Sequence, residues 1–333
     1  MLKFVIFFGI GLFFIYWFLL KLDREQKAAI WQSFVEADYG WIGLLIICTL
    51  SSHLVRALRW RLLYHPIGYR PSIANTFGSV MVAYLANLAF PRLGEVVRCA
   101  TMHTSEQIPI EKSLGTVVTE RLIDVLAFGL VVVLGLLIMF RQAKDWLYDA
   151  LSAKFDTLPS AATLLTTGVV LIVLVIVGYK VCHKFLMRFS LIQKIDKLLH
   201  GCIDGVKSIL HLGASSTCLF ITYSVLLYFL YILGGLIVLQ ALPETAGLGI
   251  GAAFVIYLFG SVGMMISQGG LGAYPVLVWQ ALTLYGISQE VSLATGWLLW
   301  GAQQAVVVVV GLIFFAFFSL AKKRRQNTIA EER

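Results

Sequence analysis

In Asn87-Leu-Ala-Phe-Pro91-Arg92-Leu-Gly94-Glu95-Val-Val-Arg98, a polar interruption divides an otherwise apolar part of the chain, and Ser267-Gln268-Gly269-Gly270-Leu-Gly272-Ala-Tyr274-Pro275 divides a later part. Each interruption lies in a stretch long enough to enter a bilayer, but each contains proline and glycine residues that end a helix. Broken helices at membrane depth usually mark a substrate site. The two breaks therefore predict both the topology of the chain and the place where it functions.

The composition is that of a polytopic membrane protein. Hydrophobic residues make up 59% and charged residues 13% of the 333 residues, and the mean hydropathy is +0.86, which excludes a soluble domain. The five cysteines form no C-x-x-C pair and have no histidine at ligand spacing, so we expect no metal site and no cofactor. Because no segment is long enough for an aqueous catalytic domain, we expect membrane lipids, and no nucleic acid, as partners.

The distribution of Lys and Arg predicts which segments face the cytoplasm. Basic residues gather in 56–70, 180–207 and 322–325, but show no excess in 21–38 and 141–160. We therefore expect the first three segments inside and the other two outside. Between residue 70, inside, and residue 141, outside, the chain must cross the membrane an odd number of times. Two apolar stretches, 73–90 and 113–140, lie between them, so one of the two cannot be a full crossing. The stretch that ends at Pro91 is expected to turn back.

The second break joins two short apolar stretches through glycines. If it is a hairpin that enters from outside, the fold is all-α, with about six full transmembrane helices, two re-entrant helical hairpins and both termini in the cytoplasm. Residues 39–140 and 216–320 are then the same unit in opposite orientation, an inverted repeat of the kind found in transporters. Eight full spans is the alternative, because four crossings in the second half also satisfy the charge distribution.

The whole chain, residues 1–333, is expected to form a single membrane domain. Apolar residues at helical spacing among basic ones predict a helix that lies in the cytoplasmic interface over residues 188–212. The expected segments are an N-terminal anchor helix and outside loop (1–38), repeat 1 (39–140), an outside loop with a linking span and the interfacial helix (141–215), repeat 2 (216–320) and a basic cytoplasmic tail (321–333).

Three ionisable residues, Glu120, Arg121 and Asp124, interrupt the apolar stretch 113–140. Arg121 and Asp124 are three residues apart and share a helical face. A charge at the bilayer centre costs roughly 2.5–3.5 kcal/mol, so such residues normally pair or face water. We expect the three to form the polar wall of a substrate site. A snorkelling cluster near the cytoplasmic interface is the alternative.

The first break carries a matching charge cluster. Arg92, Glu95 and Arg98 recur every three residues, so a short helix that begins near Pro91 would present them along one side. Two guanidinium groups suit an anionic headgroup, and Glu95 would orient one of them. Interfacial charge that only stops membrane insertion is the alternative.

The other candidate residues have weaker signals. Arg56 and Arg59 share a helical face and are expected mainly in an aromatic-basic interfacial belt with Trp60, with a secondary role as contacts to lipid phosphate. The substrate-site candidates at the two breaks are completed by Asn87, Gln268, Gly269, Gly270 and Gly272. The glycines would let the backbone approach the substrate closely.

These motifs, in this order, resemble the lysylphosphatidylglycerol synthase transmembrane-region family. The resemblance covers residues 10–320 and rests on Asn87-x-x-x-Pro91-Arg92-x-Gly94-Glu95-x-x-Arg98, Glu120-Arg121-x-x-Asp124 and Gly269-Gly270-Leu-Gly272. It implies a lipid-flippase-like fold. In the fused synthases a soluble aminoacyl-transferring domain follows this region. Because the sequence ends at Arg333, we expect no synthase activity.

We therefore expect a flippase-like transporter, not an enzyme, that moves an amphiphilic lipid between leaflets of the inner, cytoplasmic cell membrane. The lipid would be phospholipid or polyprenyl-phosphate-linked, with an anionic or phosphate-bearing headgroup. Self-association into a homo-oligomer is left open. An intramembrane transferase with a lipid-linked donor and a non-catalytic cell-envelope scaffold are the alternatives.

Replacing both Arg92 and Glu95 with Ala is expected to abolish lipid translocation in proteoliposomes and to leave folding intact, because these residues would engage the headgroup. Fluorescent or native lipid provides the measurement. Full retained translocation would contradict the assignment of this cluster to the substrate site.

Overall fold

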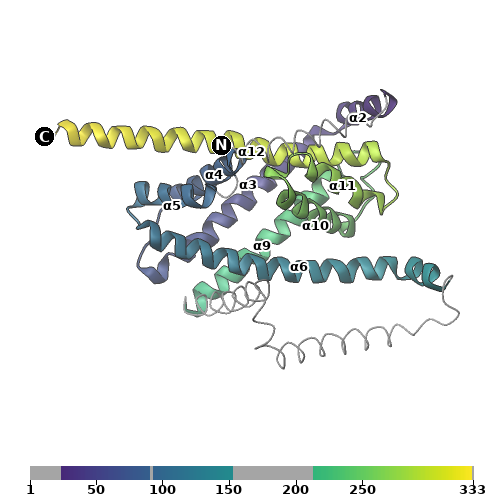
Figure 1. The fold of residues 1–333 in the computed structure, drawn as a ribbon, viewed down its shortest axis with the longest axis horizontal. Coiled ribbons are helices and arrows are strands. Elements are labelled where there is room, and N and C mark those ends of the chain that lie inside the picture. Colours follow the sequence, from purple (N-terminus) through teal and green to yellow (C-terminus); the bar gives the residue numbers. More distant parts are fainter. Residues whose placement is uncertain (1–23, 91–92, 153–212, 332–333) are drawn as a thin grey trace, which may run out of the picture. The chain divides into compact units, whose positions relative to one another are not determined.

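The structure, a computed structural model, describes residues 24–90, 93–152 and 213–331, and all regular secondary structure in these residues is helical (Figure 1). The helices before residue 153 are α2 (Arg24–Glu36), α3 (Tyr39–Leu62), η1 (His65–Ile67), α4 (Ile73–Ala89), α5 (Leu93–Glu106) and α6 (Ile110–Ser152). Those after residue 212 are α9 (Ala214–Leu239), α10 (Ile250–Ile266), η2 (Gln268–Gly270), α11 (Ala273–Thr283) and α12 (Gln289–Glu331).

The chain divides into two compact units, and the border falls inside α6. The larger unit combines Met1–Glu120 with Ile209–Arg333, and the smaller one is Arg121–Ser208. Every helix named above lies in the larger unit except the part of α6 after Glu120. The larger unit therefore contains both breaks and carries the architecture of the candidate site.

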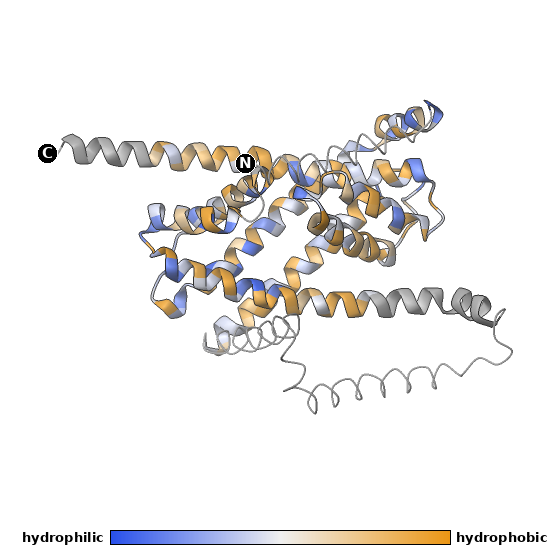
Figure 2. Cartoon of the chain, in the orientation of Figure 1, coloured by the Kyte–Doolittle hydropathy of each residue, from blue (hydrophilic) through white to orange (hydrophobic). Residues whose placement is uncertain are grey.

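Three of the described helices are long and apolar enough to cross a membrane. The apolar spans are Tyr39–Ile67, Ala214–Leu239 and Gln289–Ala321, and two shorter apolar helices cover Ile73–Leu88 and Ile250–Ile266. Figure 2 shows how consistently hydrophobic residues follow one another along the coloured part of α12. The all-helical membrane fold is confirmed at this level, and the choice between six and eight spans stays a prediction.

The first break joins α4 and α5 into an antiparallel helical pair. Phe90, which precedes a proline, has an extended backbone (φ −141°, ψ 127°), as residues before proline prefer, so α4 ends there. Near the turn the Gly94 N–H donates to Asn87 Oδ1 (2.7 Å), and at the far end Asn75 Nδ2 donates to Glu106 Oε1 (2.8 Å). These two bonds fix the register of the pair at both ends.

The second break joins α10 and α11 in the same way through η2. A Cβ atom on Gly263 would lie 2.7 Å from Tyr274 Cα, so the two backbones touch just behind the break. Within the break Gly269, Gly270 and Gly272 have φ angles of +61°, +75° and +75°, which L side chains rarely adopt. The glycines expected to allow close backbone approach are thus required by the turn itself.

The order of elements repeats along the chain. A long helix, a broken helical pair and a second long helix occur first as α3, α4–α5 and α6, and again as α9, α10–α11 and α12. The first helices of the two sets, α3 and α9, pack against each other: Cys48 Sγ donates to the Leu230 carbonyl (3.3 Å), and Arg59 Nη1 donates to Ser224 Oγ (3.3 Å). Since the later residue on α3 meets the earlier residue on α9, these helices run antiparallel.

Two segments expected as outside loops contain helix. Residues 24–36 of the segment 21–38 form α2, and α6 continues to Ser152 instead of ending near residue 140. Alanine, glutamine, lysine and leucine are good helix formers, and residues 141–152 contain no glycine or proline to stop the helix. Charge asymmetry predicts sidedness and says nothing of local backbone conformation, so the outside location of both segments stays a prediction.

Several expected elements fall outside the described residues. These are the N-terminal anchor, the linking span over 162–181, the interfacial helix over 188–212, and the first break's own Pro91 and Arg92.

Gly94→Ala is expected to lower the free energy of unfolding by about 1–3 kcal/mol, the usual cost of overpacking. A Cβ atom there would overlap the Ala83 carbonyl oxygen and come within 2.7 Å of the Asn87 amide, so α5 would have to move away from α4. Denaturant unfolding of the detergent-solubilised protein gives the measurement.

Gly115→Ala is the matched control, because a Cβ atom on that α6 glycine would meet nothing within 4 Å. It should gain about 0.5–1 kcal/mol from the better helix propensity of alanine. Equal stability of the two variants would show that the α4–α5 contact is not close.

Candidate functional site

The tips of the two broken pairs touch each other. Gln268 Nε2, in η2, donates to the Leu88 carbonyl at the end of α4 (2.7 Å). A Cβ atom on Gly269 would lie 2.8 Å from Leu88 Cδ2, at the end of that side chain, and the φ of +61° at this residue is the stronger reason for glycine there. The last carbonyls of a helix lack partners within it, and Gln268 satisfies one of them. Two breaks that are 180 residues apart in sequence therefore meet.

The second tip is held in place from α12. Trp300 Nε1 donates to the Gly269 carbonyl (2.7 Å), and Gln304 Nε2 donates to the same oxygen (3.2 Å). Trp300 and Gln304 are four residues apart, so they project from the same face of the helix. An irregular turn inside the apolar helices thus has its backbone carbonyl satisfied by protein groups, as membrane depth requires.

A buried network of charges lies at the convergence of α3, α5 and α6. Arg56 Nη1 and Arg59 Nη2 contact Glu120 Oε1 at 3.2 and 3.1 Å, and Arg98 Nη2 contacts Glu120 Oε2 at 2.9 Å. The side chains of Glu120 and Arg59 are 0% exposed, and that of Arg98 is 3% exposed. We call these four residues the Glu120 network. Shielding from water strengthens the Coulomb attraction of such pairs and adds a desolvation cost, so removing one partner leaves a costly unpaired charge.

Local sequence places each member of the network. Arg56 and Arg59 are three residues apart and therefore share one face of α3. Arg98 follows Gly94 by about one turn of α5, or ~6 Å of rise, so the hairpin geometry of the first break sets its position. Glu120 lies in the part of α6 that belongs to the larger unit.

Aromatic and hydroxyl groups fix the orientation of the guanidinium groups. The Arg98 guanidinium lies over the Trp60 ring, 4.1 Å from its centroid, and Trp60 Nε1 donates to Thr116 Oγ1 (2.9 Å). Cation–π contacts gain strength when the partners are desolvated, and Trp60 is fully buried. The network is therefore pre-organised by packing on α3 and α6.

Helix α9 connects the network to the second broken pair. Arg56 Nη2 donates to the Tyr231 hydroxyl (2.9 Å), and the Tyr231 ring stacks on Tyr257 of α10 with 5.8 Å between centroids. The Tyr228 ring meets Tyr257 edge-on, with centroids 6.3 Å apart. The stacked rings of Tyr231 and Tyr257 thus link α10 to Arg56 by direct contacts.

Chemically, the Glu120 network is a set of fork-shaped donors that share one carboxylate acceptor. Guanidinium groups bind carboxylate and phosphate oxygens with the same bidentate geometry. A phosphate group that reached the network would compete with Glu120 for the same N–H donors. The arrangement suits recognition of an anion, and in the described part of the chain no three His, Cys, Asp or Glu residues are grouped so as to hold a metal ion.

The structure brings together only some of the residues expected at the site. Glu120 and Arg98 meet as the paired clusters suggested, and Arg56 and Arg59, expected in a secondary role, contact the same carboxylate. Arg59 is fully buried, as is Trp60, so the expectation of an interfacial belt was wrong for both of them. Basic and aromatic residues near the end of an apolar helix are typical of the membrane interface, and the sequence does not show whether another helix covers them.

Arg121 and Asp124 form an ion pair with each other along α6. Their closest charged atoms are 3.8 Å apart, and their side chains are 42% and 16% exposed. Consecutive helix positions differ by 100°, so Glu120 and Arg121 point in different directions. The i,i+3 pairing was thus predicted correctly. A polar wall of Glu120, Arg121 and Asp124 around a substrate stays a prediction.

At the breaks, the candidate residues have unequal roles. Asn87 caps the start of α5, which gives it a structural task, and Glu95 is half-buried in the first turn of α5. Gln268 and the three glycines shape the second tip. Arg92 lies outside the described residues.

Sequence reasoning missed the uncharged partners Ser224, Tyr231 and Thr116. Single hydroxyl residues in apolar helices carry little signal, because they also bond to their own helix, as Ser224 Oγ does to the Phe220 carbonyl (2.9 Å). The aromatic spacing of Tyr228 and Tyr231 on one face of α9 was the one available clue.

Comparison with known proteins identifies relatives of this chain. The sequence model of the family described as the lysylphosphatidylglycerol synthase TM region matches residues 1–328. A glycosyltransferase, AglD of Haloferax volcanii, is 24% identical over 309 residues, which cover 83% of this chain and 49% of that protein. The chain thus spans about half the length of this curated relative. No solved structure matches it significantly.

Glu120→Gln is expected to lower the free energy of unfolding by about 3–5 kcal/mol, because it removes the carboxylate that three buried guanidinium groups share. Asp124→Asn, the same chemical change one turn further along α6 in a more exposed pair, should cost less than about 1 kcal/mol. Urea unfolding in detergent provides both values. If the two variants lose equal stability, Glu120 is not the centre of a buried network.

Proposed function

Because the chain belongs to the lysylphosphatidylglycerol synthase transmembrane-region family, we propose that it is a flippase-like transporter that moves an amphiphilic lipid between the leaflets of a membrane. The substrate class is a lipid with a phosphate-bearing headgroup, either a phospholipid or a polyprenyl-phosphate-linked lipid. The membrane would be the cytoplasmic one, with both termini inside.

The observation that carries this proposal is the Glu120 network. Charged side chains within apolar helices are costly to bury and in membrane proteins commonly mark a substrate or ion pathway. Here the charges sit at the junction of the first broken pair with α3 and α6, with Arg98 on the broken pair itself. Guanidinium groups suit an anionic headgroup better than ammonium groups because their donors are planar and paired.

Headgroup binding would proceed by exchange of acceptors. In the structure Arg56 and Arg59 donate to Glu120 Oε1, and Arg98 forms an ion pair with Oε2. A headgroup phosphate would replace that carboxylate at Arg98 and Arg56. Arg56 is the most accessible of the three, with an 11% exposed side chain, so it would be the first to meet the phosphate. Such an exchange keeps the guanidinium groups satisfied throughout and avoids a bare buried charge.

The two broken pairs supply the element that could move. They occur in repeated order, their tips meet at Gln268 and Leu88, and the first helices of the two sets run antiparallel. In transporters with inverted repeats, broken helices meet at the binding site, and one repeat rocks against the other. This arrangement supports alternating exposure of the site to the two leaflets. In this scheme Arg92 and Glu95 assist at the first tip.

An intramembrane transferase with a lipid-linked donor is the second candidate. The named glycosyltransferase relative favours it, although this chain spans about half of that protein. Glu95, Glu120 or Asp124 would then serve as general base. Transfer of a sugar or aminoacyl group by the purified protein would support this candidate. A non-catalytic scaffold would instead tolerate neutral replacement of the network.

Arg98→Lys is expected to slow lipid translocation by about tenfold or more, equivalent to at least ~1.4 kcal/mol, because lysine keeps the charge but loses the paired donors. The measurement is dithionite quenching of fluorescent phosphatidylglycerol in proteoliposomes, with a fluorescent polyprenyl phosphate in parallel. Arg70→Lys, an exposed arginine in the η1–α4 connection, is the control and should match the unmodified protein. Unchanged rates for Arg98→Lys with both lipids would contradict the proposal.

A further inference from the structure

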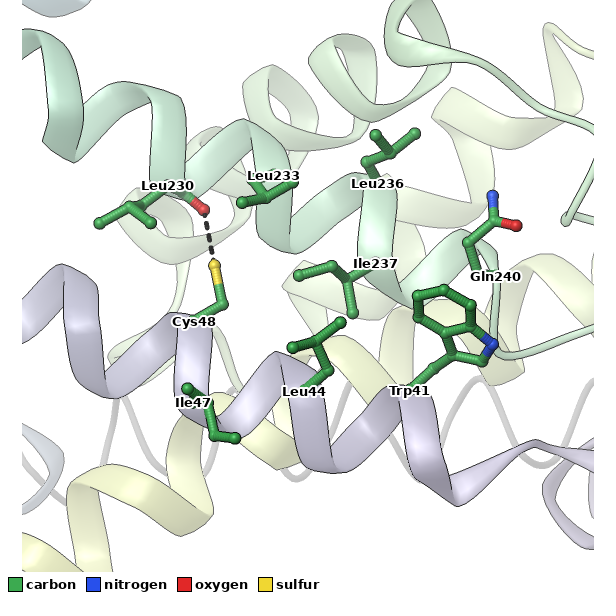
Figure 3. Close-up of a pocket in the computed structure, with 9 residues that line it drawn as sticks. All are labelled: Trp41, Leu44, Ile47, Cys48, Leu230, Leu233, Leu236, Ile237 and Gln240. Atoms are coloured by element: carbon green, nitrogen blue, oxygen red, sulfur yellow. Dashed lines mark hydrogen bonds between the residues drawn. The ribbon is translucent and has the colours of Figure 1, made fainter.

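An apolar groove runs between α3 and α9, the two antiparallel helices that open the repeated sets (Figure 3). It has a volume of about 450 Å³ and is lined by side chains that include Trp41, Leu44, Leu233 and Ile237. At one end Cys48 Sγ donates to the Leu230 carbonyl, and at the other Trp41 faces Gln240 (Figure 3). Cavities of this size accommodate small ligands, and this one offers almost no polar groups.

The groove lies in helices that can span a membrane. Both α3 and α9 are long and apolar enough to cross a membrane, so in a bilayer the exposed side chains along them would meet hydrocarbon. On the α3 side Leu44 is 42% exposed and Ile47 is 61% exposed, which leaves the groove open laterally. A hydrocarbon chain could therefore enter from the side without crossing a polar barrier.

The groove ends about two helical turns from the Glu120 network. Tyr231 directly follows Leu230 of the groove lining, and its hydroxyl accepts the hydrogen bond from Arg56. On α3, Arg56 follows Cys48 by about two turns, or ~12 Å at 1.5 Å per residue. An apolar channel and a set of guanidinium donors thus follow one another along the same pair of helices.

We propose that this groove binds the hydrocarbon chain of a phosphate-bearing lipid whose headgroup is held at Arg56 and Arg98. The inference rests on the proposed function and adds the place of the lipid chain. Along the helices, the apolar groove is followed by the tyrosine hydroxyl and then by the guanidinium groups. This spatial order matches an amphiphile with one anionic end. From Arg56 to Trp41 the path along α3 is ~22 Å, longer than one leaflet's ~15 Å share of the hydrocarbon. The site therefore favours a long chain over a short one.

Photolabelling tests this site directly. The full-length protein in vesicles is exposed to phosphatidylglycerol that carries a diazirine within its acyl chain, and in parallel to a photoreactive polyprenyl phosphate and to a diacylglycerol that lacks phosphate. We expect labels on residues 41–48 and 230–240 from one or both phosphate lipids, and competition by unlabelled long-chain lipid but not by a six-carbon analogue. The arm that labels identifies the lipid class. Labels spread evenly over these segments and the exposed face of α12 would mean ordinary surrounding lipid and would overturn the proposal.

Two leucines of α3 provide matched variants. Leu44→Trp fills the groove and should reduce its labelling to the level of α12, whereas Leu54→Trp, at a similarly exposed position outside the groove lining, should leave labelling unchanged. Arg56→Gln should remove the preference for phosphate lipids over diacylglycerol. Equal labelling in all three variants would overturn the site. Specific labelling without translocation would contradict the transporter proposal alone, and translocation with even labelling would contradict the groove alone.

Discussion

The carboxylate of Glu120 is the interaction on which the rest of the described structure depends. It ties α6 to α3 through Arg56 and Arg59, and to the first broken pair through Arg98. The arginines continue the connection to α9 through Tyr231 and Ser224. Because these groups are shielded from water, each ion pair needs the others to hold its geometry. These contacts fix the positions of the four helices along one another, which apolar packing in a lipid environment alone would specify less strictly.

A constraint of this strength also limits how the protein can work. Opening a buried network without an alternative acceptor would leave unpaired charges. Under the proposed function, an incoming anion would therefore take over the guanidinium donors when α5 moves relative to α6. The proposed headgroup phosphate is such an acceptor. Coupling of binding to movement would then follow from electrostatics, since the network can change partners only when the lipid is present.

The second break contributes shape instead of charge. Its glycines adopt left-handed conformations, its carbonyl is capped by Trp300 and Gln304, and its glutamine reaches the end of α4. The chemistry and the mechanical contact are thus divided between the two halves of the chain. The groove between α3 and α9 extends this division, because it places an apolar surface next to the charged one on helices that belong to different halves.

The sequence by itself determined the membrane class, the two helix breaks and the residue types that had to be buried or paired. These properties follow from local composition: proline and glycine end helices wherever they occur, and a long apolar run excludes water. Only the tertiary structure decided which charges meet. Arg56 and Arg59 lie more than 60 residues before Glu120, and no local pattern specifies that their helices converge. Arg121, next to Glu120 in sequence, pairs with Asp124 on its own helix. Helical periodicity fixes directions within one helix, and the packing of separate helices, set by contacts such as Gly94 on Ala83, decides which of those directions face each other.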